Sequence, residues 1–434
     1  MAYEKQNFTD GQVLYADNLT HMEEGIAEIN TDYVKQDFKD GQILYADNLN
    51  HMEDGIAEAH RRAGAGGGSD AQWIAEIERD STPVTAIPQS ITRVGDGAFY
   101  NCTNLKIDGL PDGVGYIGDE AFCNCYEIAW TSLPAGVTYI GTRAFDTCRK
   151  LVLTALPVGI TQINGAAFRW CTSLALTALP EGLTSIGDEA FNTCNSLALT
   201  QLPSGVSYIG ERAFYYCDKL ALTSLPSGLT EIEKEAFRDC TNLALTSLPG
   251  GMTWIGEGAF YGCSKLALTS LPSGLEEIED STFYRCTNLA LTSLPESVSY
   301  IGLQAFSYCT NLALTSLPDG VRSIGNNAFR ECSRMTLTAL PTDLKTIGTY
   351  AFYYCGGVSI DTIPANVGSV GSYAFGYCNK LTSLTFEGTP TTIEQNAFYR
   401  CDNLTVINVP WAEGEVANAP WGATNATINY NYTG

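Results

Sequence analysis

The stretch that decides the fold begins at Leu225-Pro226-Ser227-Gly228-Leu229-Thr230-Glu231-Ile232 and continues through Ala236-Phe237-Arg238-Asp239-Cys240-Thr241-Asn242-Leu243-Ala244-Leu245-Thr246-Ser247. The pattern starts again 23 residues later at Leu248-Pro249. Phenylalanine precedes the cysteine by three residues in all fourteen coils, and proline precedes it by fourteen residues in thirteen of them. The in-phase cysteines are Cys102, Cys125, Cys148, Cys171, Cys194, Cys217, Cys240, Cys263, Cys286, Cys309, Cys332, Cys355, Cys378 and Cys401. Such a fixed period indicates a solenoid, in which each coil contacts only its neighbours.

Each coil is expected to contain two short extended segments and one helical turn. Leu-Ala-Leu-Thr-Ser-Leu has alternating apolar residues and ends at proline, so it predicts a strand. Gly-Leu-Thr-x-Ile predicts a second extended segment, and Gly-x-x-Ala-Phe-x-x-Cys predicts a tight helical turn that points phenylalanine and cysteine inward. Stacked in register, these segments give parallel strands about 4.8 Å apart. The predicted fold class is a repeat solenoid of short parallel strands with helical turns, preceded by a small helical duplicated module.

The domain boundaries follow the changes in repeat period. Residues 1–60 hold a duplication with a period of 30, because residues 8–19 recur as residues 38–49. A flexible linker at 61–69, a cap helix at 70–83, the solenoid at 84–408 and a C-terminal cap at 409–434 follow. Each copy of the duplication carries one apolar stripe, which so short a module cannot bury alone. The stripes are predicted to make attachment or oligomer contacts through Leu19, Met22, Ile26, Leu49, Met52 and Ile56.

Composition narrows the classes of partner. The 434 residues include 48 Asp and Glu against 24 Lys and Arg, giving a formal net charge of -24. This charge repels phosphate backbones and anionic lipid, so nucleic acid and membrane surfaces are excluded as partners. No stretch of 18 apolar residues is present, and residues 1–6 lack a basic region followed by an apolar core. The chain is therefore expected to have no secretory signal and to fold in a cytoplasm.

The cysteines are predicted to be free thiols. A disulfide framework has irregular spacing, whereas fourteen of the fifteen cysteines recur every 23 residues and only Cys123 is out of step. Cysteine without a disulfide behaves as a small apolar residue and is among the most buried residue types. The sequence therefore predicts a column of reduced, buried thiols.

Residues that could carry catalysis are scarce. The three histidines, His21, His51 and His60, all lie outside the solenoid, which excludes a Ser-His-Asp arrangement and histidine-bearing zinc sites from the repeats. Paired carboxylates such as Asp188 and Glu189 stand in columns that vary from coil to coil, which is typical of a solvated edge. The sequence predicts that the protein is not an enzyme and has no catalytic residue, no metal site and no cofactor.

The columns that vary between coils are the candidates for recognition. The two residues before each cysteine vary, as does the residue before the second isoleucine, and tyrosine, tryptophan and arginine recur there. These residue types are enriched in binding hot spots, although stacked tyrosines can also simply shield the coil edges. The binding interpretation expects exposed rings on one continuous aromatic edge, formed by Tyr208, Tyr215, Tyr216, Trp254, Tyr261, Tyr284, Tyr300 and Tyr308.

The coil resembles that of the bacterial surface leucine-rich repeat family often called BspA-like. That family carries Leu-x-x-Ile-x-Ile-Pro, then Val-x-x-Ile-Gly, then Ala-Phe-x-x-Cys at the same spacing as this chain. The resemblance covers about three quarters of the sequence and implies a leucine-rich-repeat solenoid.

The two ends carry a second resemblance. The duplicated Phe-x-Asp-Gly-x-x-Leu-x-Ala-x-x-Leu-x-His-Met-Glu-x-Gly-Ile looks like the N-terminal module of tail and head-fibre proteins of phages that infect Gram-positive bacteria. Residues 409–423 look like the closing segment of repeat proteins from such phages. This resemblance implies a phage virion fibre or adhesion protein, homotrimeric, localised to the virion, anchored to capsid or tail proteins and binding a host-surface glycan or protein. The alternative is a bacterial surface or secreted adhesin of the BspA-like kind.

Overall fold

The computed structural model describes residues 13–14, 44–45, 87 and 89–434. Within the duplication it describes only strands β1 (Val13–Leu14) and β2 (Leu44–Tyr45), which pair antiparallel so that Leu14 lies opposite Leu44, its equivalent in the second copy. The predicted stripe contacts, linker and cap helix lie outside the described residues. The chain forms two compact units, and the solenoid considered below is the unit made of residues 93–104 and 114–434.

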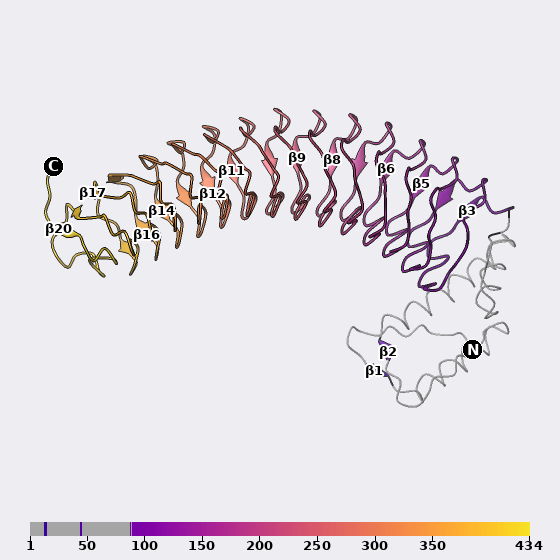
Figure 1. The fold of residues 1–434 in the computed structure, drawn as a ribbon, viewed down its shortest axis with the longest axis horizontal. Coiled ribbons are helices and arrows are strands. Elements are labelled where there is room, and N and C mark those ends of the chain that lie inside the picture. Colours follow the sequence, from indigo (N-terminus) through magenta and orange to yellow (C-terminus); the bar gives the residue numbers. More distant parts are fainter. Residues whose placement is uncertain (1–12, 15–43, 46–86, 88) are drawn as a thin grey trace, which may run out of the picture. The chain divides into compact units, whose positions relative to one another are not determined.

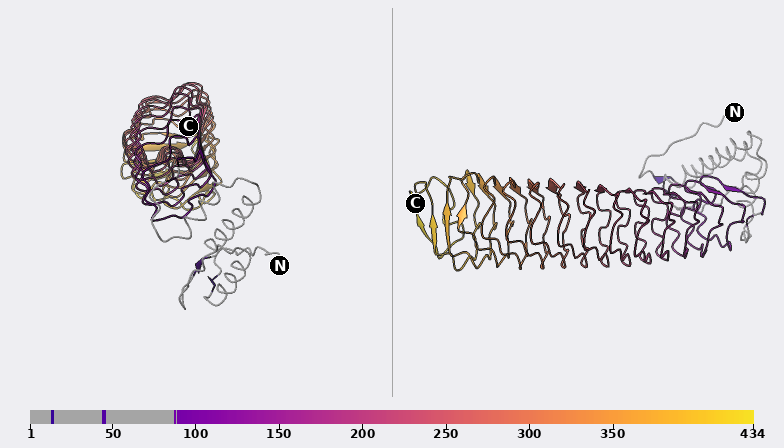
Figure 2. Two further views of the ribbon diagram at one scale, coloured as in Figure 1. Left: turned by 90° about the vertical axis from the view of Figure 1, so that its right-hand side faces the viewer. Right: turned by 90° about the horizontal axis from the view of Figure 1, so that it is seen from above.

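The solenoid unit is a right-to-left arc of stacked coils, drawn from indigo to yellow in Figure 1, and the coils superimpose in the view along the stack in Figure 2. One column of two-residue strands runs through it, and every pairing is parallel with a register of 23 residues, as for Ile232 and Ile255. The strands are β3 (Arg93–Val94), β4 (Tyr116–Ile117), β5 (Tyr139–Ile140), β6 (Gln162–Ile163), β7 (Ser185–Ile186), β8 (Tyr208–Ile209), β9 (Glu231–Ile232), β10 (Trp254–Ile255), β11 (Glu277–Ile278), β12 (Tyr300–Ile301), β13 (Ser323–Ile324), β14 (Thr346–Ile347), β16 (Ser369–Val370) and β18 (Thr392–Ile393).

These strands follow the expected alternation. The second residue of each strand is buried in the core, whereas the first lies outside it. The parallel solenoid predicted from the 23-residue period is therefore confirmed, and this column corresponds to the segment Gly-Leu-Thr-x-Ile.

The Leu-Ala-Leu-Thr-Ser-Leu segment differs from its prediction. It forms strands only in the last coils, as β15 (Thr362–Ile363), β17 (Ser383–Phe386) and β19 (Val406–Asn408), to which β20 (Thr427–Asn429) adds in parallel. In the middle coils the segment keeps a single backbone bond to the preceding coil, such as Ala244 N to Leu222 O at 3.1 Å, and then bends at the threonine. The last coils carry more β-branched and aromatic residues there, which favour an extended backbone.

The predicted helical turns are also absent, since the described part of the chain contains strands and turns but no helix. Before each cysteine, the residues five and one positions upstream have positive φ, for example 52° at Glu235 and 57° at Asp239. Their amides donate to the following coil, as Asp239 N does to Tyr261 O at 2.6 Å, instead of to the carbonyl four residues back. Two left-handed residues in one segment cannot belong to a right-handed helix, so the prediction of helical turns is wrong.

The core consists of stacked columns of identical side chains. The phenylalanine rings stack from coil to coil with centroids 5.0 Å apart at Phe99–Phe122 and 5.8 Å apart at Phe260–Phe283. Beside them, thirteen cysteine thiols each donate to the carbonyl oxygen of the phenylalanine 26 residues earlier, at 2.9–3.2 Å. These thirteen thiols are buried, as predicted, whereas Cys102 in the first coil is half-buried.

The C-terminal end of the stack is covered by two tryptophans. Trp411 and Trp421 are both buried, and their rings lie 5.3 and 6.3 Å from that of Phe386. The carbonyl of Trp421 accepts the Phe398 amide at 2.9 Å, which is the place that a further coil occupies elsewhere in the stack. The last coil therefore has its core and its backbone donor covered.

Candidate binding surface

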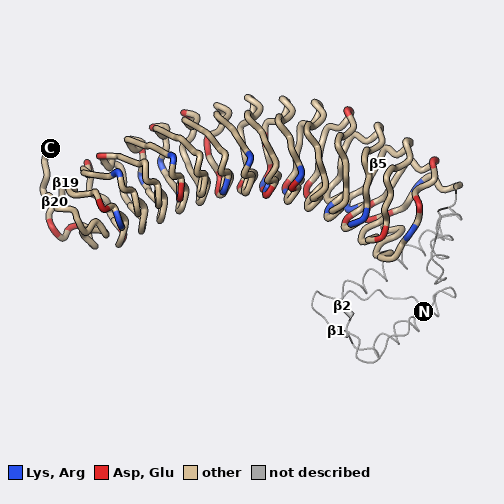
Figure 3. Tube along the Cα trace, in the orientation of Figure 1, with Lys and Arg blue, Asp and Glu red and all other residues tan. Residues whose placement is uncertain are grey.

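The turn before each cysteine places three variable side chains on one edge of the solenoid unit. We define the edge strip as the residues five, two and one positions before each in-phase cysteine from Cys125 to Cys401. The charged residues of the unit gather mostly along the inner edge of its arc (Figure 3). Because the backbone repeats in register, side chains at these positions in successive coils contact one another directly.

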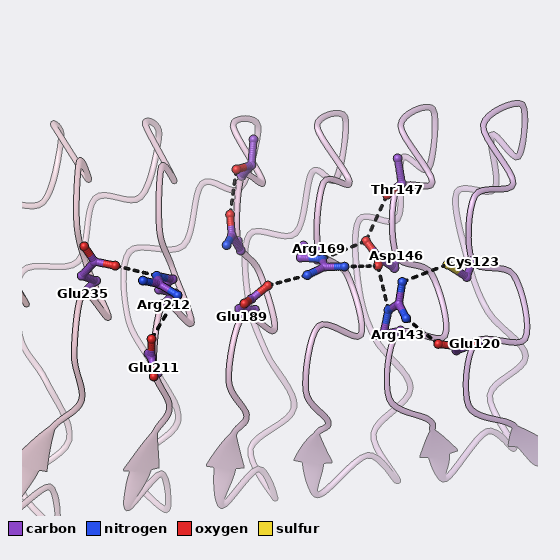
Figure 4. Close-up of polar contacts among 12 residues, drawn as sticks. Glu120, Cys123, Arg143, Asp146, Thr147, Arg169, Glu189, Glu211, Arg212 and Glu235 are labelled. Carbon is purple, nitrogen blue, oxygen red and sulfur yellow. Dashed lines mark hydrogen bonds and ion pairs between the residues drawn. The ribbon is translucent and has the colours of Figure 1, made fainter. Parts of the chain in front are cut away.

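The N-terminal part of the edge strip is a chain of ion pairs (Figure 4). Arg143 bridges Glu120 at 2.6 Å and Asp146 at 3.0 Å, and Arg169 bridges Asp146 and Glu189 at 2.6 and 2.7 Å. Asp146 is only 1% exposed, so its charge depends on the two arginines. The hydrogen bonds that Arg169 donates to Asp146 and Glu189 hold the pKa of Arg169 above its ordinary value.

The character of the strip changes at Arg238. Its guanidinium pairs with Glu235 at 2.6 Å, and Glu235 also accepts from Arg212 at 2.5 Å. The same guanidinium lies over the ring of Tyr261, 4.0 Å from the centroid, and 5.7 Å from that of Tyr215. From this residue onward, rings replace carboxylates as the neighbours of the strip arginines.

The C-terminal part of the strip is a run of stacked tyrosines. The shortest ring contacts are Tyr354–Tyr377 at 4.2 Å and Tyr261–Tyr284 at 4.4 Å, both nearly parallel. Edge-to-face contacts extend the run, and burial raises the pKa of Tyr353 in its centre. The tyrosines of the run are Tyr261, Tyr284, Tyr308, Tyr350, Tyr353, Tyr354, Tyr373, Tyr377 and Tyr399.

The predicted site residues fall into two columns instead of one edge. Tyr215, Tyr216, Tyr261, Tyr284 and Tyr308 lie in the edge strip. The others, Tyr208, Trp254 and Tyr300, start strands β8, β10 and β12, with Glu231 and Glu277 on the strands between them. Within residues 89–434 no ring contact joins these three to the strip. Tyrosines of the strip touch across coils because their turns stack, whereas the strand column has a carboxylate between its rings.

Exposure also differs from the sequence expectation. Only Tyr208 and Tyr216 are exposed, at 43% and 42%, and the other six are half-buried. Tyr208 donates to Asp188 at 3.2 Å, and burial together with the Asp188 charge raises the pKa of Tyr208 to about 12. Trp254 donates to Glu279 at 3.4 Å. These rings therefore pack against neighbouring side chains and also expose one face to solvent. Both interpretations left open by the sequence, binding and shielding of the coil edges, are compatible with this arrangement.

The richest aromatic cluster of the strip lies later in the chain than predicted. The densest set of rings is centred on Tyr353, which contacts Tyr350, Tyr354, Tyr373 and Tyr377 at centroid distances of 4.7–6.2 Å. Tyr350 and Tyr373 stand five residues before a cysteine, outside the columns that were predicted to take part in recognition. The pair of consecutive coils with tyrosine at that position was the signal that could have revealed the cluster.

Parallel strands, a 23-residue coil and stacked inward columns define a leucine-rich-repeat solenoid. Residues 81–198, 184–313 and 299–418 match the family described as BspA type Leucine rich repeat region. The chain belongs to this family.

Several leucine-rich-repeat proteins of known structure are similar to the chain. A leucine-rich repeat protein from Bacteroides ovatus ATCC 8483 is 24% identical with a TM-score of 0.49, over 80% of this chain and 84% of that chain. A leucine rich cell surface protein from Faecalibacterium prausnitzii A2-165 is 23% identical with a TM-score of 0.44, over 80% and 88%. The T. pallidum Leucine Rich Repeat protein is 31% identical with a TM-score of 0.31, over 37% and 77%. No curated protein matches the chain.

Two features are absent from the part of the chain that the structure describes. No helix there is long and apolar enough to cross a membrane. In the same residues, no group of three or more histidine, cysteine, aspartate and glutamate side chains is arranged to hold a metal ion.

Proposed function

We propose that the protein is an adhesin-like surface or secreted repeat protein of the BspA type, and that its edge strip binds a glycan or protein of a host surface. Membership of the BspA-type family supports this function over the phage fibre. The observation that carries the binding role is the set of contacting tyrosines on one edge, which forms two groups, Tyr261 to Tyr308 and Tyr350 to Tyr399, joined by the contacts of Arg330 with rings of both groups. Tyrosine offers a large contact area at low entropic cost, and a rigid solenoid holds successive rings at fixed spacing.

Removing two stacked rings is expected to weaken binding more than stability. Tyr354 is 41% exposed and stacks on Tyr377, so Tyr354→Ala with Tyr377→Ala deletes a flat contact surface without opening the core. Binding to an array of host-surface glycans and proteins is expected to fall about tenfold or more, as for a hot spot. The free energy of unfolding is expected to change by about 1 kcal/mol or less.

Tyr432→Ala provides the matched control, because Tyr432 has the same 41% exposure but lies in the C-terminal cap outside the edge strip. Its array binding is expected to equal that of the unaltered protein. If the double variant unfolds while binding per folded molecule is unchanged, the tyrosine run serves packing and the proposed function is wrong.

The second candidate is the phage virion fibre, which one specific observation favours. The duplicated sequence of residues 1–60 resembles attachment modules of such fibres, although its apolar stripes lie outside the described residues. A variant that begins at Ser69 is expected to fold but to fail to join virions, as judged by protein content of purified particles. Normal incorporation of the shortened protein, or absence of the full chain from any particle, would exclude this function.

A further inference from the structure

Three arginines of the edge strip, Arg285, Arg330 and Arg400, differ from the rest by having no carboxylate partner among the described residues. Arg143, Arg169, Arg212 and Arg238 each form an ion pair with an aspartate or glutamate. Arg285 and Arg330 form none with any of the described residues, although the chain carries a formal net charge of -24. Glu331 follows Arg330 directly and makes no ion pair with it. The cations of Arg285 and Arg330 are therefore not neutralised by the residues around them.

Tyrosine rings hold the guanidinium groups of Arg285 and Arg330 in place. The Arg285 group lies 5.4 Å from the ring centroid of Tyr284 and 5.5 Å from that of Tyr308. Arg330 lies 5.5 Å from Tyr308 and 5.6 Å from Tyr353, so Tyr308 separates the two cations. Cation–π contacts orient a guanidinium without consuming its hydrogen-bond donors. The arginines are positioned but retain donors for another group.

Two polar atoms beside this pair are left without partners. Nε of Arg330 is buried and forms no hydrogen bond, and the same is true of Oγ of Ser307, whose residue is fully buried. Ser307 and Arg330 occupy the same position in consecutive coils, two residues before the cysteine. Buried polar groups are nearly always hydrogen-bonded, and an exception points to a strained or functional site. In this strip Nε of Arg238 is likewise buried without a hydrogen bond, so three such atoms lie between the coils of Arg238 and Arg330.

We propose that Arg285 and Arg330, whose guanidinium groups lie against tyrosine rings, bind an acidic polysaccharide that lies along the edge strip. This inference rests on the proposed function and specifies its ligand. The guanidinium fork pairs two N–H groups with one carboxylate, and the tyrosine faces between the arginines stack on sugar rings. The arginines lie two coils apart, roughly 10 Å at the spacing of parallel strands, which suits one acidic group per disaccharide.

An acidic polypeptide is less well matched to the same surface. An extended peptide places its side chains on alternate sides, so its carboxylates on one face recur about every 7 Å. The surface formed by the flat rings of Tyr308 and Tyr353 also offers no backbone donors or acceptors. A peptide therefore could not bind there by adding a strand to a sheet edge. A carbohydrate with regularly spaced carboxylates satisfies both the rings and the cations.

The test uses the full chain and hyaluronan oligosaccharides, which carry one carboxylate per disaccharide, measured by titration calorimetry at low salt. Carboxyl-reduced hyaluronan supplies the same backbone without the charge, and poly-glutamate supplies the charge without sugars. Arg285→Gln with Arg330→Gln is expected to raise the Kd for hyaluronan about tenfold or more. Arg149→Gln is the matched control, since Arg149 also lies over a tyrosine, Tyr126 at 5.3 Å, but outside the strip. Its Kd is expected to be unchanged.

The outcomes separate this inference from the proposed function. Equal affinity for hyaluronan and its carboxyl-reduced form, or tighter binding of poly-glutamate, overturns the acidic polysaccharide. Array binding that survives the double arginine change but is lost in the Tyr354 and Tyr377 variant overturns this inference and leaves the proposed function standing. Loss of hyaluronan binding in the double arginine variant alone, with Arg149→Gln unaffected, supports it.

Discussion

Raising the pH from about 8 to about 10 is expected to destabilise the solenoid by more than any single substitution. Burial raises the pKa of Cys355 and of Cys401 to about 12, and it raises the pKa of Cys240 well above the ordinary value. In the unfolded chain a thiol ionises near pH 8.5, so above that pH the unfolded state binds fewer protons than the folded state. Stability is therefore complete below about pH 8.5 and is lost as the pH rises toward the folded-state pKa.

The effect is large because the column repeats. At about pH 10 each buried thiol is expected to lower the free energy of unfolding by about 2 kcal/mol. The total loss is the sum over all the buried thiols of the column. The total exceeds the ordinary net stability of a domain, which is about 5–15 kcal/mol. We expect circular dichroism to show cooperative unfolding in this range, in the presence of a reductant.

A variant with fewer thiols tests the cause. Replacing Cys217, Cys240 and Cys263 by alanine is expected to reduce the loss of stability between about pH 8 and about pH 10 by about 6 kcal/mol. The urea midpoint is measured at steps of pH from about 8 up to the pH at which each protein unfolds, and the slopes with pH are compared, so cavities left by the smaller side chain cancel in the comparison. An identical pH dependence in the two proteins would show that tyrosines, and not thiols, control alkaline unfolding.

Phe237→Ala is expected to lower the free energy of unfolding by about 3–5 kcal/mol, the range for removing a buried aromatic side chain. The Phe237 ring is fully buried and stacks on Phe214 at 5.4 Å and on Phe260 at 5.7 Å. Because each coil is stabilised only by its neighbours, a cavity in the middle uncouples two halves of the stack. Urea unfolding followed by fluorescence is expected to show a lower midpoint and a second transition.

Phe99→Ala in the first coil is the control for position. Phe99 belongs to the first coil of the phenylalanine column and stacks on Phe122 at 5.0 Å, so its loss is expected to affect mainly the terminal coil. The midpoint for the remaining coils is expected to change little. Equal effects of the two substitutions would contradict a stack stabilised by nearest neighbours.

The sequence by itself determined the parallel stack and its inward columns. A period of 23 residues fixes which residues lie above one another, so Phe237, Cys240 and Ile232 had to align with their equivalents in every coil. Burial of those columns follows from their apolar character, because a coil has only one interior. The extended segment ending in isoleucine was correctly predicted for the same reason.

Only the tertiary structure decided the conformation of the turns and the order of the edge strip. Glu235, Asp239 and Tyr354 adopt positive φ, although residues of these types rarely do so by themselves. Hydrogen bonds from their backbone amides to the following coil impose that conformation. No sequence pattern within one coil encodes these hydrogen bonds. The pairing of Arg169 with Asp146, and the isolation of Arg330 among tyrosines, likewise depend on side chains 20 or more residues apart meeting across the stacked turns.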